Sequence, residues 1–259
     1  MTSPKTIVIT GASAGIGAAL ATQLGTRGHR LVLAARRERE LGEVAGRAGQ
    51  GAIAVVADLT RRGDVARLHD RALEAFGHVD VWVNNAGRGI TRNVLDLTDE
   101  DVDEMMAVNL KSALYGMQAI VPHFIERGQG HLINVSSFLG RVPLVSYRSA
   151  YNAAKAALNA LTANLRADLA RAHPGIHVSL VIPGVVTTEF ARNALGGARQ
   201  LPPGAMAARP QSPDEAAAVM VGLIEHPVPE VYTNPAQAAV VARYYEDVAA
   251  FERESGWRV

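Results

Sequence analysis

The residues best suited to chemistry are a tyrosine and a lysine in the stretch AYNAAKAALNAL, residues 150–161. Tyr151 lies four positions before Lys155, one of only three lysines in the chain, so on a helix both side chains project from the same face. A phenol with an ordinary pKa of about 10 transfers protons poorly at neutral pH, and an ammonium one turn away stabilises the phenolate and lowers that pKa. The pair therefore predicts a tyrosine general acid/base tuned by a lysine.

The same stretch also fits an ordinary amphipathic helix. In that interpretation Tyr151 ends a core-facing stripe and Lys155 is a solvated charge. The stripe holds four leucines at core spacing: Leu158, Leu161, Leu165 and Leu169. Other motifs in the chain must decide between the two interpretations.

A glycine-rich turn follows the first apolar run. TGASAGIGAAL, residues 10–20, spaces Gly11, Gly15 and Gly17 as G-x-x-x-G-x-G. Between a strand and a helix, such a turn directs backbone N–H groups and the helix N-terminus at a place where a pyrophosphate can bind. The alternative is a tight turn whose glycines only relieve backbone strain. Its position at the start of a β-α-β unit favours a dinucleotide site.

The elements that must position these motifs alternate between short apolar runs and helix-length segments. The runs expected as strands are 6–10, 30–35, 52–57, 79–84, 131–136, 177–182 and 230–233. They are mostly apolar on both faces, which is typical of a parallel sheet covered by helices on both sides. We therefore expect an α/β, doubly wound Rossmann fold with a mainly parallel seven-stranded sheet. Two capping boxes, Thr98 with Asp101 and Ser212 with Glu215, mark helix starts.

Composition restricts the class of protein. The 259 residues, 48% of them hydrophobic, suit one domain, and a formal charge of +1 without a basic cluster gives no reason to expect nucleic acid or a membrane as partner. The lack of cysteine excludes disulfides and thiolate sites, and the eight histidines are scattered, so we expect no metal. The N-terminal apolar run is too short for a signal peptide or a membrane span. We expect a cytoplasmic protein with a small-molecule partner.

Four motifs together resemble the short-chain dehydrogenase/reductase family in its compact single-domain form. TGASAGIG resembles the family's cofactor turn, NNAG at 84–87 the motif after its fourth strand, SS at 136–137 with YNAAK at 151–155 its catalytic stretch, and PGVVTT at 183–188 its P-G-x-V-x-T segment. They stand in the family's order over nearly the whole chain. The resemblance implies one Rossmann domain, residues 1–259, that transfers hydride between a nicotinamide cofactor and a carbonyl or secondary alcohol.

The resemblance also implies a catalytic set of Asn109, Ser137, Tyr151 and Lys155. Ser136 and Ser137 end a strand and point to opposite faces, and the family's S-x-x-G selects Ser137 as the donor to the carbonyl oxygen. Lys155 would also bind the ribose. Asn109 would hold a water for proton relay, or would only bond back to its own helix. Ser137 and Tyr151 are 14 positions apart, one more than the family's commonest spacing, which would reshape the loop 141–150.

Further positions match the family's binding residues. Those expected to bind the cofactor are Gly11, Ser13, Gly15, Ile16, Gly17, Arg36, Arg37, Asp58, Leu59, Asn85, Ala86, Gly87, Tyr151, Lys155, Pro183, Gly184, Val186 and Thr188. Asp58 would bond the adenine, or would be an ordinary strand-end carboxylate. Those expected to bind substrate are Ser137, Phe138, Leu139, Tyr147 and Tyr151. Nearby Val142, Leu144, Val145 and Phe190 suggest an apolar pocket and an apolar substrate.

The end of the second expected strand, LVLAARRERE, bears on the choice of dinucleotide. An enzyme that reads the free ribose 2′-hydroxyl of NAD usually has an acid there, but this chain has Ala35 followed by Arg36 and Arg37. A guanidinium suits the 2′-phosphate of NADP, so we expect NADPH, with NAD less favoured. The arginines could instead open a solvated helix. Ala14 also stands where many NADP-preferring relatives carry a second basic residue, so we expect a moderate preference.

Two other classes share parts of the pattern. A catalytically silent dinucleotide-binding sensor of the same fold would keep the glycine turn but usually damage the catalytic set, which is intact here. A sugar epimerase or dehydratase of the family's longer branch needs a sizeable C-terminal substrate domain. Only about 25 residues follow the last expected strand. An oxidoreductase is the better interpretation.

Three segments give expectations about the surface. Residues 196–213, rich in Gly and Pro, are expected to form a substrate loop or lid, or else a disordered loop. Residues 236–254 are expected to form one amphipathic helix that packs on its own sheet or on a neighbouring subunit. The alanine-rich helix 149–172 has an apolar outer face that, with the resemblance, predicts a homo-oligomer, a tetramer.

Overall fold

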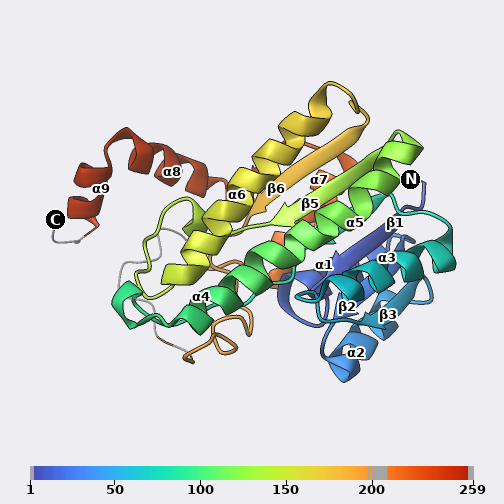
Figure 1. The fold of residues 1–259 in the computed structure, drawn as a ribbon, viewed down its shortest axis with the longest axis horizontal. Helices are drawn as coiled ribbons and strands as arrows, with labels where there is room; N and C mark the ends of the chain where they lie inside the picture. Colours follow the sequence, from blue (N-terminus) through green and yellow to red (C-terminus); the bar gives the residue numbers. More distant parts are fainter. Residues whose placement is uncertain (1–2, 198, 200–208, 256–259) are drawn as a thin grey trace.

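The computed structural model describes residues 3–197, 199 and 209–255. A parallel sheet lies between two layers of helices (Figure 1). Its strands have the order β3-β2-β1-β4-β5-β6-β7, and every neighbouring pair is parallel. Their bounds are β1 Thr6–Thr10, β2 Arg30–Ala35, β3 Ala52–Val56, β4 Val81–Asn84, β5 Gly130–Val135, β6 Ile176–Ile182 and β7 Glu230–Tyr232. The predicted doubly wound Rossmann fold with seven strands is confirmed.

Helices cover both faces of the sheet. Those described are α1 Gly15–Gly25, α2 Glu38–Ala48, α3 Arg62–Phe76, α4 Asp99–Met106, α5 Ser112–Arg127, α6 Ser149–Ala170, α7 Pro213–Glu225, α8 Ala236–Glu246 and α9 Val248–Glu254, with short turns η1 Val94–Asp96, η2 Ala107–Lys111 and η3 Phe138–Gly140. Helices α1, α2 and α7 pack on one face, and α3, α5 and α6 pack on the other (Figure 1).

The continuous hydrophobicity of the strands follows from this double cover. In β1, Ile7 and Ile9 pack with α1, α2 and α7, whereas Val8 between them packs with α3 and α5. Successive side chains of a strand point to opposite faces. Because both faces are buried, a polar side chain in β1 is costly unless it is hydrogen-bonded, as Thr10 Oγ1 is to Val83 O at 3.1 Å.

The strand order reverses at β1, which has β2 on one side and β4 on the other. In open α/β sheets the crevice at the carboxyl ends of the strands around such a reversal is the usual ligand site. The ends of β1 and β4 are joined here, since Asn85 Nδ2 donates to Thr10 O at 2.9 Å and Thr10 Oγ1 accepts from Asn85 N at 2.9 Å. The sequence motifs follow these strand ends.

Both predicted capping boxes are present. Thr98 Oγ1 accepts from Asp101 N and the Asp101 carboxylate accepts from Thr98 N at the start of α4. Ser212 and Glu215 make the same reciprocal pair at the start of α7, with Pro213 in the first turn. Residues 198 and 200–208 of the expected lid lie outside the described residues, so the lid stays a prediction.

The C-terminal segment corrects one expectation. Residues 236–254 form two helices, because Asp247 adopts an extended conformation (φ −151°, ψ 95°) between α8 and α9 and its carboxylate accepts from Ala250 N at 2.8 Å. Asp favours a helix N-cap over a helix interior. Both helices extend from the layered body (Figure 1) and contact their own fold, where Phe251 and Tyr244 pack with Ile182 of β6.

Candidate functional site

A cavity of about 700 Å³ lies at the carboxyl ends of the central strands. Residues from the loops after β1, β2, β3, β4, β5 and β6, from the first turn of α1 and from α6 line it. Nearly all residues that the motifs assign to a cofactor or substrate are among them. Those assigned residues that do not line it are Gly17, Asn109 and Tyr147.

The glycine turn has the conformation that its sequence predicts. Gly11 and Gly15 have φ values of 67° and 56°, a left-handed region that other residues rarely adopt. Gly17 serves packing, because a Cβ there would lie 2.6 Å from both Asn85 Nδ2 and Gly11 O. The α1 N-cap is Ala14, which offers no side-chain cap. The backbone N–H groups of the first turn of α1 can therefore donate to an anionic ligand.

The two arginines after β2 differ in their contacts. Arg37 donates through Nε and Nη2 to Ser13 Oγ, both at 3.2 Å, and pairs with Glu189 at 3.3 Å. Arg36 is exposed and lines the cavity beside Ala35. Within the described part of the chain, Arg36 makes no ion pair.

Asp58 at the end of β3 is already engaged locally. Its Oδ1 accepts from Thr60 N at 3.1 Å and from Thr60 Oγ1 at 2.8 Å. This is the behaviour of a strand-end carboxylate that shapes the turn into α3. Asp58 and Leu59 nevertheless line the cavity, and the second oxygen of Asp58 lies 3.8 Å from the exposed Arg61.

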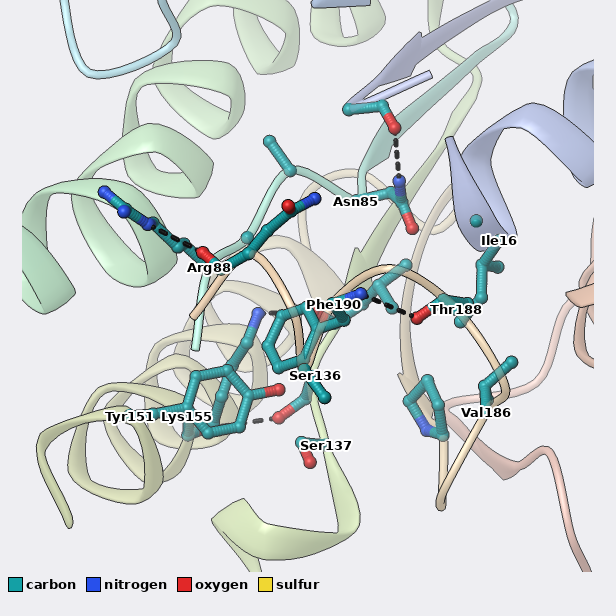
Figure 2. A pocket seen from close by; sticks show the side chains of 18 of the residues that line it. Ile16, Asn85, Arg88, Ser136, Ser137, Tyr151, Lys155, Val186, Thr188 and Phe190 are labelled. Carbon is teal, nitrogen blue, oxygen red and sulfur yellow. Dashed lines mark hydrogen bonds between the residues drawn. The ribbon is translucent and has the colours of Figure 1, made fainter. Parts of the chain in front are cut away.

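Tyr151, Lys155 and Ser137 meet where α6 crosses the end of β5. Figure 2 shows Tyr151, Ser137 and Phe190 converging on one space, with Thr188 and Ile16 farther along it. Tyr151 and Lys155 are 6% and 3% exposed. Lys155 Nζ donates to Val135 O at 2.9 Å and lies 5.8 Å from the centroid of the Tyr151 ring.

The two serines after β5 have different partners. Ser136 Oγ donates to Lys155 O at 3.3 Å and to Asn159 Oδ1, so it ties the strand to the body of α6. The Ser137 side chain is near enough to the Tyr151 phenol to lower its pKa, and it accepts from Leu139 N at 3.1 Å. The structure therefore brings Ser137, the serine of the S-x-x-G motif, to the phenol.

Burial and a neighbouring positive charge act on the pKa of Tyr151 in opposite directions. Burial raises the pKa of Tyr151, and the Ser137 side chain and the positive charge of Arg148 oppose that rise. Burial lowers the pKa of Lys155 itself to about 8, and its ammonium is turned to the Val135 carbonyl. The positive charge of Arg148 is the one that lowers the pKa of the phenol here, and the tuning of Tyr151 by Lys155 stays a prediction.

Asn109 lies in a π-type turn between α4 and α5, a local widening common near functional sites. Its Oδ1 accepts from Arg88 N at 3.1 Å, and its Nδ2 donates to Arg88 O at 2.9 Å and to Met105 O at 3.1 Å. Asn109 thus bonds back to its helix and also fixes the loop after β4. A Cβ on Gly87 would lie 3.0 Å from Asn109 Oδ1 and 3.6 Å from Lys155 Nζ.

The end of the cavity around Tyr151 has an apolar wall and two polar residues that the motifs do not reveal. The wall is formed by Phe138, Leu139, Leu144, Val145 and Phe190, whereas Val142 and Tyr147 are buried behind it. The ring centroids of Phe190 and Tyr151 are 5.4 Å apart. The polar residues are Arg148, three positions before Tyr151, and Gln237 of α8. No motif contains either residue.

The residues that the structure describes offer neither a membrane span nor a cluster of metal ligands. None of the helices described is both long enough and apolar enough to cross a membrane. Over the same residues, no three histidine, aspartate or glutamate side chains gather as metal ligands.

The geometry agrees with comparisons to known proteins. A family model described as short chain dehydrogenase matches residues 5–197. An uncharacterized oxidoreductase of Staphylococcus epidermidis is 36% identical over 196 residues, 76% of this chain and 84% of that protein. A short chain dehydrogenase/reductase of Burkholderia phymatum, solved in complex with NAD, has a TM-score of 0.85 and 27% identity over 95% of each chain. A short-chain dehydrogenase of Sphingobium yanoikuyae in complex with NADPH has a TM-score of 0.79 and 28% identity, again over 95% of each.

Fold and site define a dinucleotide-dependent oxidoreductase with a Rossmann fold. The chain belongs to the short-chain dehydrogenase family and is an NAD(P)-dependent dehydrogenase/reductase. The residues present fit such a cofactor: α1 lacks a side-chain cap, Gly11 and Gly15 hold the turn open, and the cavity continues from there to Tyr151.

Proposed function

We propose that this protein is an NADP-dependent oxidoreductase that acts on a carbonyl or secondary alcohol substrate, with Tyr151 as the general acid/base. The observation that carries the proposal is one continuous cavity. Tyr151, Ser137 and Lys155 line one end of it, and the uncapped N-terminus of α1 lies at another.

The proposed roles follow from the contacts. The dinucleotide, when bound, supplies or accepts the hydride. Ser137 and Tyr151 hold the substrate oxygen between their hydroxyl groups, and Tyr151 donates its proton there as negative charge develops on the oxygen. Lys155 keeps a cationic group against the dinucleotide ribose and the Tyr151 ring. Apolar residues such as Phe190 and Leu139 exclude water from the reacting atoms.

The preference for NADP is supported by the end of β2. Ala35 leaves no carboxylate there to accept a bond from a free ribose hydroxyl, and Arg36 lines the cavity without an ion pair among the described residues. Arg37 is held by Ser13 and Glu189. We therefore assign the 2′-phosphate to Arg36, whose guanidinium N–H groups can donate to it.

Replacement of Tyr151 by Phe tests the proposal. The variant removes only the transferable proton, so dinucleotide binding is retained and turnover falls by at least about a hundredfold, within the range that general acid/base groups contribute. Binding is measured by fluorescence titration with NADPH, and turnover by cofactor absorbance over a panel of carbonyl compounds and alcohols.

The matched control is Tyr115→Phe, which removes a phenol oxygen from α5, outside the cavity, where Arg62 stacks on the ring. That variant is expected to keep its activity. Near-normal turnover by Tyr151→Phe would refute the acid/base role. A wild-type protein that binds NADPH but turns over no compound in the panel would favour the silent dinucleotide sensor.

A further inference from the structure

A buried guanidinium stands beside the proposed reaction centre. Arg148 immediately precedes α6, is 6% exposed and lines the cavity. It lies three residues before Tyr151, so the two side chains share one side of the helix start. The Arg148 Cζ atom is 6.0 Å from the centroid of the Phe190 ring, which in turn lies 5.4 Å from the Tyr151 ring centroid.

Arg148 has a hydrogen bond but, in the part of the chain that the structure describes, no counterion. Its Nη1 donates to Ile90 O at 3.0 Å, which uses one of five guanidinium donors. Among the residues that the structure describes, no carboxylate lies within 4.0 Å of Arg148. Three other cavity-lining arginines do have a glutamate partner: Arg37 with Glu189, Arg88 with Glu104, and Arg209 with Glu215.

The surroundings of Arg148 disfavour an unpaired positive charge. Burial removes the guanidinium from water and lowers its pKa, and the helix N-terminus that follows carries a partial positive charge of its own. The fold nevertheless makes room for the group, since a Cβ on Gly89 would lie 2.6 Å from Arg148 Nη1 and 2.9 Å from the Phe190 ring. A neutral donor could make the single hydrogen bond to the Ile90 carbonyl, so this bond does not explain a buried charge at Arg148. An anionic ligand would explain it, because it pairs with the charge.

We propose that Arg148 binds a carboxylate of the substrate, so that the substrate is an oxo acid or the corresponding hydroxy acid. The inference rests on the proposed function, because it places the substrate's carbonyl oxygen at Tyr151 and Ser137. Hydride adds to the carbonyl carbon and the Tyr151 proton to the oxygen, and the carboxylate is unchanged. Arg199 lines the same cavity and adds a second positive charge. The expected apolar pocket is therefore apolar on one wall and cationic on another.

Matched acids and esters test the inference in the wild-type protein. The probes are pyruvate, acetoacetate and levulinate, each compared with its methyl ester, which keeps the carbonyl and removes the charge. With NADPH present, at least one acid is expected to be reduced with a kcat/KM about ten- to a hundredfold above that of its ester, the gain that one charge-assisted pair provides. If every ester is reduced as well as its acid or better, the proposal is overturned.

Substitution of Arg148 locates the effect. In Arg148→Met the preferred acid is expected to lose about ten- to a hundredfold more in kcat/KM than its ester, with the difference mainly in KM. The loss of the positive charge beside Tyr151 affects both compounds alike, and Arg148→Lys restores part of the difference. Arg71→Met is the control for net charge, because Arg71 is an exposed residue of α3 already paired with Glu74. An equal loss for acid and ester in Arg148→Met would mean that Arg148 acts only on Tyr151 or on the fold, and would overturn the proposal.

A binding measurement separates this proposal from the reaction itself. 3-Hydroxybutyrate, but not its methyl ester, is expected to raise the Tm of the NADPH-loaded wild-type protein and to have no such effect on Arg148→Met. If this dependence is found without turnover of any carbonyl compound, the anion site stands and the oxidoreductase proposal fails. If neutral ketones are reduced but the acid stabilises wild type and Arg148→Met equally, the reaction stands and the anion site fails.

Discussion

Lys155 keeps an ammonium group in a place that is costly for a charge. The side chain is 3% exposed and makes one hydrogen bond, to the neutral Val135 carbonyl. Burial accordingly lowers its pKa from 10.5 to about 8. This cost supports the functional role proposed for Lys155, because an apolar side chain of similar length would suit the same position better in the absence of ligand.

Lys155→Met is therefore expected to stabilise the dinucleotide-free protein. The folded-state pKa lies below the unfolded one, so the unfolded chain binds more protons between about pH 8 and 10.5 and the wild type gains stability across that window. Below about pH 8 Lys155 is charged in both the folded and the unfolded chain, so the wild type there bears the full free-energy cost of the buried charge. The variant should exceed wild type there by about 1 to 3 kcal/mol, and the difference should shrink toward pH 10.5.

Urea unfolding of both proteins from pH 6 to 10.5 measures this difference. Lys111→Met, at an exposed helix position, is the control and should show little change at any pH. A Lys155→Met variant that is less stable than wild type at pH 7, or whose advantage does not depend on pH, would contradict the assignment of a buried ammonium.

Sequence reasoning located Tyr151, Lys155 and Ser137 because their signal is local spacing. The sequence does not reveal where an ammonium points, so the contact of Lys155 with the Val135 carbonyl could not be foreseen. Arg148 was missed for a different reason. Its significance is the lack of a carboxylate partner in the described fold, a property that no spacing in one sequence encodes.

At the scale of elements, the end of β2 makes the choice of dinucleotide testable. Wild type is expected to prefer NADPH over NADH about tenfold or more in kcat/KM, from charge-assisted bonds of about 1.5 to 3 kcal/mol each. Ala35→Asp with Arg36→Ile should reverse the preference, because the acid repels the 2′-phosphate and accepts from the free hydroxyl. Steady-state kinetics with both cofactors decide the matter. Equal use of the two by wild type would show that Arg36 does not read the phosphate.

The packing of η3 against α6 gives a second test. A Cβ on Gly140 would lie 2.8 Å from Lys155 C and 2.9 Å from Lys155 Cβ, so Gly140→Ala must push η3 and Ser137 away from the helix. We expect a loss of about 1 to 3 kcal/mol in stability and a lower kcat. Gly42→Ala is the matched control, since nothing lies within 4 Å of a Cβ there and a helix gains about 0.5 to 1 kcal/mol. Unfolding and kcat are measured for both variants, and a fully active Gly140→Ala would contradict the packing.

Most elements were predictable because their signals are short-range. Double burial made the strands apolar throughout, and the reciprocal Thr98–Asp101 and Ser212–Glu215 pairs marked helix starts. The C-terminal segment was not predictable from hydrophobic spacing, because residues of α8 and α9 fall on one stripe whether or not the helix is continuous. The break depends on one residue, Asp247, whose carboxylate caps α9 in place of continuing α8.

At the scale of the whole molecule, α6 keeps a row of alanines on its surface. The row consists of Ala153, Ala156, Ala160, Ala163, Ala167 and Ala170, all exposed. Small side chains let a second helix approach closely, and the predicted homotetramer would cover this apolar face. Multi-angle light scattering should give about four times 27.4 kDa. A monomer at micromolar concentration would refute the prediction. The cytoplasmic location likewise stays a prediction.

The uncapped start of α1 also has a consequence for how much folded enzyme a cell contains. A ligand that completes the hydrogen bonds of a folded helix end binds the native chain and not the unfolded one, so it shifts the folding equilibrium by mass action. A dinucleotide pool a hundredfold above its dissociation constant adds about 2.7 kcal/mol. The coenzyme is in this sense a folding ligand, and depletion of the pool would expose more of the chain to proteases and chaperones before any catalytic rate was limited by it.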